Sequence, residues 1–309
     1  MGKISVILPA FNEEGNISLL IEKVNKAFTD NYIDGEAILI NDGSTDNTGQ
    51  IAEELAKRYA FLRVYHHKRN MGLTKALSNG FKRASGDIIV FLCSDLQSDP
   101  VEDIPKLLEG IKQGADVVVG WREGRKEFKK VGSKVYNWVS KLLFGVNVHD
   151  QNWIKAFRKE FVQDLILRSD WHRFLIAIAI HKGYRVVEVK TNWHPRTYGE
   201  SKYGFMRIPA AILDMLVLKI EMMFLESPMW FFGSLGILFG LLGFGIQVGL
   251  FMLKHLSGVF LPEYDRLKYF LVSILLILLG TGIFSLGLLG EFMVSYFEKI
   301  SNKQEREDE

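Results

Sequence analysis

The chain has 309 residues, and its 38 Lys and Arg nearly balance its 36 Asp and Glu. This balance disfavours nucleic-acid binding driven by bulk positive charge, and we expect no nucleic-acid partner. No charged residue occurs from Ser227 to Leu253 or from Tyr269 to Gly290, and each run exceeds the roughly 20 residues that cross a bilayer as a helix, which excludes a purely soluble protein.

Short β-branched runs alternate with longer amphipathic runs through the first 120 residues, a pattern typical of a parallel sheet covered by helices. We expect strands at 3–8, 36–41, 61–66, 87–92 and 115–120. We expect helices at about 15–28, 46–58, 71–84 and 101–113. The pattern predicts an α/β, Rossmann-like domain whose ligands bind beyond the carboxyl ends of the strands.

Polar residues follow all five predicted strands, at 9–14, 42–46, 69–72, 94–99 and 121–125. A single Asp after a strand is usually a helix cap, but five such segments at one edge favour a binding site. Asp95 and Gln97 can present a carboxylate and an amide oxygen to one Mg²⁺ or Mn²⁺, although such a pair is common in loops. Asp42 can accept hydrogen bonds from a base or a ribose, by analogy with dinucleotide sites.

Seven basic and two acidic residues lie from Arg122 to Lys141, interleaved with apolar residues. This pattern suits a helix at about 128–145 that lies on an anionic bilayer, and a surface helix packed on its own domain is the alternative. Farther along, Arg207, Asp214 and Glu221 repeat every seven residues in a very apolar segment, which predicts a second interfacial helix.

The two uncharged runs predict transmembrane helices at about 228–253 and 269–290. We therefore expect a catalytic domain at 1–203, an interfacial helix at 204–226, a transmembrane pair within 227–298 and a charged tail at 299–309. Two spans return the chain to the side it left. The N-terminal residues do not resemble a secretory signal, so we place both ends in the cytoplasm and expect a multi-pass protein of the cell membrane.

Six motifs in order carry a resemblance to a known family. They are PAFNEE at 9–14, NDGSTDNT at 41–48, RNMG at 69–72, DLQSDP at 95–100, VGWR at 119–122 and HPRTYGESKYG at 194–204. Together they resemble the family 2 inverting glycosyltransferases. Within that family, the chain resembles the polyprenyl-phosphate glycosyltransferases, the group that includes dolichol-phosphate mannose synthase and bacterial undecaprenyl-phosphate sugar transferases. The resemblance spans nearly the whole chain.

The resemblance implies a GT-A fold followed by interfacial helices and a two-helix transmembrane hairpin. It also implies inverting transfer of a sugar from a UDP- or GDP-linked donor to undecaprenyl or dolichyl phosphate at the cytoplasmic face of the membrane. The product would be a lipid-phosphate-linked sugar used in cell-envelope glycan synthesis. Relatives with two spans suggest a homo-oligomer, and we expect a tetramer.

The resemblance also assigns roles to residues. Donor contacts are expected from Pro9, Phe11, Glu13, Ile40, Asp42 and Ser94. Asp95 and Gln97 would hold Mg²⁺ or Mn²⁺ on the donor pyrophosphate, and Arg122, Arg196 and Lys202 would surround the phosphates. Asp150 is a candidate acid or base on the acceptor side, and the acceptor phosphate would be oriented by Ser133, Lys134, Lys155 and Arg173. An alternative for Arg196 and Lys202 is a basic patch that only attracts lipid headgroups.

One position departs from the family pattern. Cys93, the single cysteine, stands where the family commonly has an acidic residue two positions before the metal-binding Asp. A buried thiol packs as a small hydrophobic group, so the departure puts metal affinity or a donor contact in doubt. Two other functions compete with lipid-phosphate transfer. One is a membrane-bound family 2 enzyme that acts on a glycan acceptor, and the other is a non-catalytic nucleotide-binding membrane protein.

Overall fold

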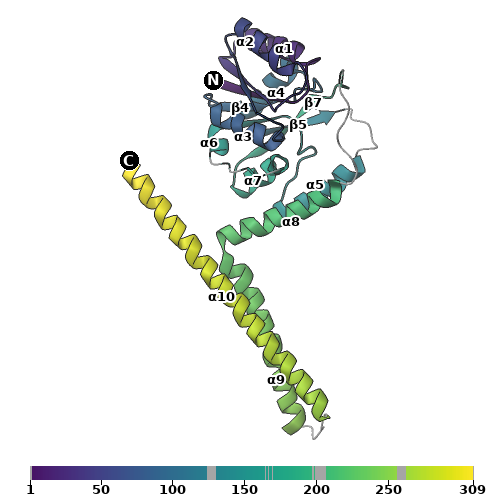
Figure 1. The fold of residues 1–309 in the computed structure, drawn as a ribbon, viewed down its shortest axis with the longest axis vertical. Helices are drawn as coiled ribbons and strands as arrows, with labels where there is room; N and C mark the ends of the chain where they lie inside the picture. Colours follow the sequence, from purple (N-terminus) through teal and green to yellow (C-terminus); the bar gives the residue numbers. More distant parts are fainter. Residues whose placement is uncertain are drawn as a thin grey trace. The chain divides into compact units, whose positions relative to one another are not determined.

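The computed structural model describes residues 2–123, 130–163, 165, 167–168, 170–196, 198, 207–255 and 262–308. The chain divides into two compact units, Met1–Met215 and Leu216–Glu309. The first unit holds a seven-stranded mixed sheet and the second holds two long apolar helices (Figure 1).

The sheet has the strand order β3-β2-β1-β4-β6-β5-β7. Its strands are β1 (Ile4–Ala10), β2 (Gly35–Asn41), β3 (Leu62–His66), β4 (Ile88–Phe91), β5 (Val117–Glu123), β6 (Lys155–Arg158) and β7 (Val186–Asn192). The strands β1 to β4 pair in parallel, as do β5 and β7, whereas β6 runs antiparallel between β4 and β5. All five predicted strands are confirmed, and β6 and β7 are additions that the sequence analysis did not include.

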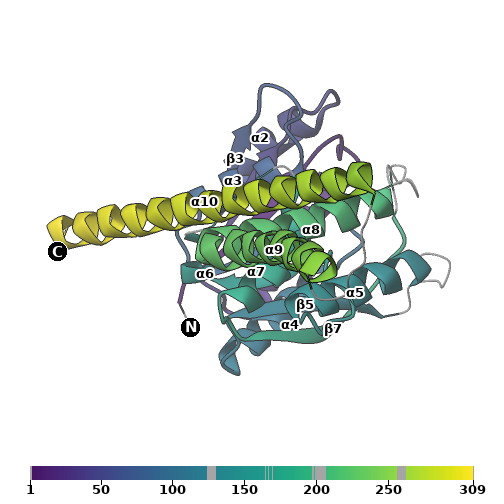
Figure 2. The same ribbon diagram turned by 90° about the horizontal axis from the view of Figure 1, so that it is seen from below.

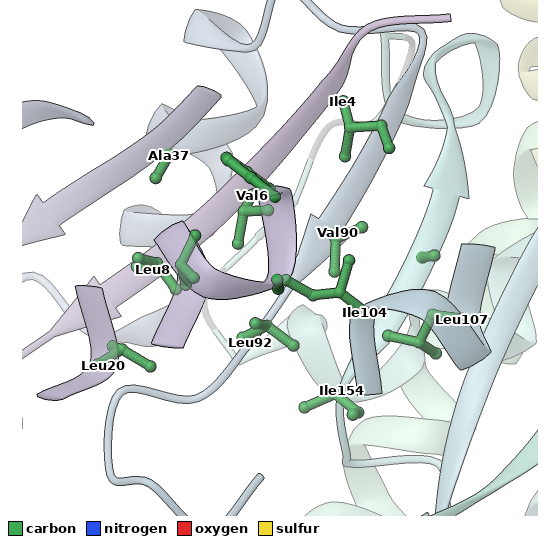
Figure 3. Close-up of a cluster of buried hydrophobic side chains, with 14 of the residues drawn as sticks. Ile4, Val6, Leu8, Leu20, Ala37, Val90, Leu92, Ile104, Leu107 and Ile154 are labelled. Atoms are coloured by element: carbon green, nitrogen blue, oxygen red, sulfur yellow. The ribbon is translucent and has the colours of Figure 1, made fainter. Parts of the chain in front are cut away.

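Helices cover both faces of the sheet because its central strands are apolar on both sides. The helices of the first unit are α1 (Ile17–Asp30), α2 (Thr48–Arg58), α3 (Leu73–Arg83), α4 (Pro100–Lys112), α5 (Lys130–Phe144), α6 (Lys159–Gln163) and α7 (Leu175–His181), with a 3₁₀ turn η2 (Trp171–Phe174). On one face, Val6 and Leu8 of β1 pack with Leu20 of α1 and Ile104 of α4 (Figure 3). On the other face, Ile7 packs against Gly80 of α3.

Local signals fix where two helices begin, next to the strand ends. The side chain of Asp99 accepts a hydrogen bond from the backbone N–H of Val101, and Pro100 occupies the first turn of α4. Gly72 precedes α3 with φ of 85°, a backbone conformation that favours glycine. Both helix starts therefore hold their preceding loops at the carboxyl edge of the sheet.

The predicted basic amphipathic segment forms α5, which has two different faces. Tyr136 and Phe144 are buried, and the Tyr136 hydroxyl donates to the backbone oxygen of Arg173. Val135, Trp138 and Leu142 are exposed and share the opposite face. The helix thus packs on its own domain and also presents an apolar stripe outward.

The helix α8 (Arg207–Glu226) is the second predicted amphipathic helix. Ala211, Met215 and Leu218 are buried along it, whereas Leu213 and Val217 are 62% and 56% exposed. Exposed apolar side chains at this density are unusual for a surface in water.

The second unit contains a π-helical turn η3 (Met229–Gly233), α9 (Ser234–His255) and α10 (Glu263–Asp308). Met229–His255 and Glu263–Phe297 are long and apolar enough to cross a membrane. The helices α9 and α10 lie side by side, and α10 extends well beyond α9 (Figures 1 and 2). They meet closely at Gly236, where a Cβ would press on the backbone oxygen of Gly280, and Gln247 donates to Ser273 at 2.6 Å.

Candidate active site

The loops after β1 and β2 are joined by hydrogen bonds at the carboxyl edge of the sheet. The backbone N–H of Asn12 donates to Ser44 Oγ at 3.0 Å, and that of Glu13 donates to Thr48 Oγ1 at 2.8 Å. In return, Asn12 Oδ1 accepts from the backbone N–H of Thr45 at 2.9 Å. The two polar segments that the sequence places after separate strands therefore form one surface.

The loop after β4 joins the same surface, because Ser94 Oγ donates to the backbone oxygen of Pro9 at 2.8 Å. Pro9, Phe11 and Glu13 are half-buried there. The expectation for Ile40 needs correction, since its side chain is fully buried inside β2 and presents no surface to a base. An apolar side chain in a central strand that is covered on both faces has no route to a ligand.

Asp42 organises the loop after β3. Its Oδ1 accepts from His67 Nδ1 at 2.6 Å and from the backbone N–H of Met71 at 2.8 Å, and its Oδ2 accepts from the N–H of Gly72 at 2.8 Å. His67 Nε2 in turn lies 2.7 Å from Asn79 Nδ2, which holds the imidazole ring between Asp42 and α3. In this structure Asp42 is thus mainly engaged in holding the RNMG loop. The sequence analysis missed His67.

Asp95 lies almost buried after β4, with both carboxylate oxygens in use. Oδ1 accepts from the backbone N–H of Gln97 at 3.2 Å, and Oδ2 accepts from Arg196 Nε at 2.9 Å and Nη2 at 2.8 Å. Leu96 has φ of 54°, and this left-handed turn places Asp95 and Gln97 at the same end of β4. Arg196 comes from the segment after β7, 101 residues along the chain.

The residues around Asp95 fit a hard divalent cation. Carboxylate and amide oxygens are the ligands that Mg²⁺ and Mn²⁺ prefer, and the guanidinium on Oδ2 shows that this oxygen accommodates a positive charge. Within the described ranges, no group of three or more His, Cys, Asp or Glu side chains is placed to hold a metal ion. An ion at Asp95 and Gln97 would therefore complete its coordination with phosphate oxygens and water.

Glu13 adds a second carboxylate to this surface. Burial raises the pKa of Glu13, the negative charge of Asp95 raises it further, and a 2.6 Å hydrogen bond from Asn16 opposes both effects. The charge of Arg196 also acts on Glu13, so the loops after β1, β4 and β7 share one electrostatic environment.

Arg122 and Asp150 form a second charged pair at the end of β5. Arg122 Nε lies 2.5 Å from Asp150 Oδ2, and its Nη2 donates to Oδ1 at 2.8 Å, a bidentate geometry. The guanidinium also lies over the ring of Trp153, 4.5 Å from the ring centre. Asp150 is therefore held by a cation, and a role as general base would require that pair to open.

Glu188 on β7 positions this pair, and the sequence analysis missed it. Its Oε1 accepts from the backbone N–H groups of His149 and Asp150 at 2.7 and 3.1 Å. Its Oε2 lies 2.7 Å from His149 Nδ1, and the ring of Trp121 stacks on His149 with centroids 4.2 Å apart. A glutamate in a strand has no local signature that reveals such a role.

Cys93 lies close enough to Asp95 and Lys155 for their charges to act on its thiol. Burial raises the pKa of the Cys93 thiol to about 12, and the negative charge of Asp95 adds to the effect, so the thiol is neutral. Burial lowers the pKa of Lys155 to about 8. Lys155 is 1% exposed, and its Nζ donates to the backbone oxygen of Trp153 at 2.7 Å.

Of the four predicted acceptor residues, Lys155 and Arg173 are the two whose side chains the structure describes. Lys155 needs correction, because its position on β6 between β4 and β5 buries the ammonium and leaves no surface for a lipid phosphate. Arg173 is largely buried and lies 4.0 Å from Asp170. Ser133 and Lys134 belong to α5, but their side chains, like the whole of Lys202, lie outside the described residues.

This mixed sheet, with two arginine–carboxylate pairs at its carboxyl edge, belongs to a chain that matches glycosyltransferases of the GT-A fold. A solved structure supports the fold. Glucosyl-3-phosphoglycerate synthase from Mycobacterium tuberculosis, in complex with Mn²⁺, UDP and phosphoglyceric acid, matches with a TM-score of 0.56 at 20% identity, over 71% of this chain and 78% of that one. The same enzyme with Mg²⁺ and UDP matches with a TM-score of 0.54 at 20% identity, over 71% of this chain and 79% of that one.

The family model described as glycosyl transferase family 2 matches residues 5–158. Dodecaprenyl-phosphate galacturonate synthase from Rhizobium johnstonii is 32% identical over 94% of this chain and 87% of its own. Undecaprenyl-phosphate 4-deoxy-4-formamido-L-arabinose transferase from Proteus mirabilis is 28% identical over 95% of this chain and 89% of its own length. The chain belongs to glycosyltransferase family 2 and is an enzyme, which removes the alternative of a non-catalytic nucleotide-binding protein.

Proposed function

We propose that this enzyme transfers a sugar from a nucleotide diphosphate donor to a polyprenyl phosphate, giving a lipid-phosphate-linked sugar. The observation that carries the proposal is the extent of the similarity. Relatives whose names specify dodecaprenyl or undecaprenyl phosphate match over 94% and 95% of the chain, far beyond the 5–158 region of the family model. Two helices apolar enough to cross a membrane suit an acceptor that is dissolved in a bilayer.

On the donor side, the joined loops after β1, β2 and β4 are the proposed nucleotide surface. Pro9, Phe11 and Glu13 line it from β1, while Ser94 closes it from β4. Asp42 contributes by holding the RNMG loop and retains capacity on Oδ2 for one ribose hydroxyl or base N–H. These contacts would fix the UDP or GDP moiety and so orient the sugar.

Asp95 and Gln97 are the proposed ligands of Mg²⁺ or Mn²⁺, which would supply charge neutralisation for the departing diphosphate. Arg122 and Arg196 are the proposed phosphate contacts, with Lys202 as a third. Both arginines hold carboxylates in this structure, so each already has its guanidinium at the edge where the donor would bind. Their fixed charges would stabilise negative charge that develops as the glycosidic bond breaks.

On the acceptor side, a phosphate monoester is largely ionised at neutral pH and needs orientation more than deprotonation. We propose Ser133, Lys134 and Arg173 for that orientation, with Asp150 acting after release from Arg122. An acceptor oxygen attacking opposite the departing diphosphate would invert the anomeric carbon. The exposed apolar stripe of α5 is suited to hold this acceptor side at the bilayer surface.

We further propose that α9 and α10 span the cell membrane, with the catalytic domain on the cytoplasmic side. The division into a catalytic domain at 1–203, an interfacial helix at 204–226, spans within 227–298 and a tail at 299–309 belongs to this proposal. So does assembly as a homo-oligomer, with four copies as the expected number.

The test is a screen of UDP- and GDP-linked sugars against undecaprenyl and dolichyl phosphate, with purified protein in detergent and Mg²⁺ or Mn²⁺. We expect labelled sugar in the organic extract, released from the lipid by mild acid. Asp95→Asn should lose transfer by about 10²-fold or more, since it removes a charged metal ligand. Asp30→Asn, at the exposed end of α1, is the matched control and should be fully active. Label that enters only a water-soluble glycan would contradict the lipid acceptor.

A further inference from the structure

Three described residues that follow β7, His194, Arg196 and Tyr198, each contact a different part of the proposed donor and metal site, and we call these three residues the strap. The backbone N–H of His194 donates to the backbone oxygen of Gln97 at 3.0 Å. The strap is therefore attached to the loop that carries both proposed metal ligands.

The second contact is ionic. Arg196 directs Nε and Nη2 at the same oxygen, Asp95 Oδ2, at 2.9 and 2.8 Å. The remaining oxygen of Asp95 accepts from the backbone N–H of Gln97. A divalent cation on Asp95 would lie beside the guanidinium that now holds Oδ2, and two cations on one carboxylate repel each other.

The third contact is steric. The ring of Tyr198 lies over Gly15, just before α1, so closely that a Cβ on Gly15 would come within 2.9 Å of Tyr198 Cγ. Tyr198 is otherwise 60% exposed, so this contact places a large ring beside the loop of Glu13. The three residues of the strap thus contact the loop of Asp95 and Gln97 and the turn at Gly15 before α1.

We propose that the strap keeps the metal site closed until a nucleotide binds, with Arg196 as a tethered cation in place of the metal. This inference rests on the proposed metal and nucleotide site and adds its regulation. A nucleoside diphosphate offers Arg196 a new anionic partner, which frees Asp95 Oδ2 for the divalent ion. Metal and nucleotide then favour the same open arrangement, so each strengthens binding of the other.

The physical consequence is that Mn²⁺ alone binds the wild-type enzyme weakly. Arg196→Gln removes the competing charge, so this variant should bind Mn²⁺ without nucleotide about tenfold more tightly than wild type, within the usual range of coupling between sites. Gly15→Ala and Tyr198→Ala leave Arg196 in place but loosen the strap. Both should tighten Mn²⁺ binding by a smaller factor.

The experiment measures free Mn²⁺ by electron paramagnetic resonance during titration of the full-length protein in detergent, with and without UDP. Arg63→Gln is the matched control, because Arg63 also pairs with a carboxylate, Glu36 at 3.3 Å, at the other end of β2. Arg63→Gln should bind Mn²⁺ as tightly as wild type, both with and without UDP. Arg196→Lys keeps the positive charge but lacks the planar guanidinium that directs two N–H groups at one oxygen. Its Mn²⁺ affinity without UDP should therefore lie between those of wild type and Arg196→Gln.

Equal Mn²⁺ affinity of wild type and Arg196→Gln without UDP would overturn the strap's role, even if Arg196→Gln is inactive. It would leave the metal site and the transferase function standing. If no variant binds Mn²⁺ even with UDP, both the metal assignment and the strap are wrong. Transfer of sugar to polyprenyl phosphate in the same preparations, measured in parallel, shows whether the proposed function stands independently of either result.

Discussion

Two roles are considered for Arg196, a phosphate contact and a basic patch that attracts lipid, and they predict different effects of substituting this residue. A phosphate contact acts mainly on charge that develops in the transition state, so Arg196→Ala should lower kcat by about 10²-fold. A basic patch that attracts lipid contributes only about 1 kcal/mol of membrane association for each residue. The distinguishing measurement is kcat in detergent with a saturating, short, soluble polyprenyl phosphate. We expect the defect to persist there, and recovery of the wild-type kcat would favour the lipid patch.

Cys93 is unusual because a neutral thiol lies beside both a carboxylate and a buried ammonium. A carboxylate at this position would be opposed by Asp95 and favoured by Lys155 and Arg122. We therefore expect Cys93→Asp to fold and to bind Mn²⁺ with UDP at least as tightly as wild type. The double variant Cys93→Asp with Lys155→Met should unfold at a clearly lower temperature than either single variant, because it removes one of the positive charges that favour the new carboxylate. Additive effects in thermal unfolding would contradict this coupling.

Residues of the candidate site could be predicted from the sequence only where a polar side chain directly follows a predicted strand. The positions of Asp95, Gln97 and Arg122 at the sheet edge were predicted this way, because apolar runs mark β4 and β5 and the strand ends share one edge. Glu188 and His67 act through hydrogen bonds to residues far away in the chain, and such bonds leave no local pattern. Lys155 was misassigned because a lysine usually indicates exposure, and only the insertion of β6 into the sheet buries it.

Among the elements, α4 carries a buried acid in its first turn. Burial raises the pKa of Asp103 to about 7; its Oδ2 accepts from the backbone N–H of Asp99, and Oδ1 has no partner among the described residues. Its pKa in the folded protein exceeds the unfolded value of 3.8, so the folded state binds the extra proton and stability falls as pH rises from about 4 to 7.

Asp103→Asn removes this titration and keeps an oxygen for the Asp99 N–H. The variant should therefore melt at a higher temperature than wild type at pH 8, by about 3 °C or more, and at nearly the same temperature at pH 4. Thermal unfolding across this pH range is the measurement. A wild-type stability that rises between pH 4 and 7, with no change on substitution, would show that Asp103 is ionised in the folded protein.

The pairing of α9 with α10 depends on glycine rather than on large side chains. At Gly236 a Cβ would meet backbone atoms of α10, whereas at Gly245 it would meet nothing within 4 Å. Gly236→Leu should therefore lower the thermal stability of the purified protein in detergent, and Gly245→Leu should leave it nearly unchanged. Equal effects of the two substitutions would show that the helices are not in contact at Gly236.

At the scale of the whole molecule, the proposed donor contacts and the proposed membrane spans lie in different parts of the chain. All proposed donor contacts precede residue 204, whereas α9 and α10 begin after residue 230. A protein truncated after Glu226 should bind UDP with Mn²⁺ as wild type does, yet transfer poorly to a long-chain acceptor. Calorimetry and a transfer assay on liposomes test the two halves of this prediction. Full activity of the truncated protein on undecaprenyl phosphate would show that the apolar helices are dispensable.

The antiparallel strand β6 has a consequence for how the protein is made. Because β6 lies between β4 and β5, the edges of those two strands stay unpaired until residues 155–158 have been synthesised. An open strand edge is prone to pairing with other chains, so the nascent domain is prone to aggregation from the time β4 has been synthesised until β6 follows. All seven strands nevertheless precede α9 in the chain. The sheet can thus close during translation before the apolar helices emerge, and the order of elements favours a folded domain before membrane insertion begins.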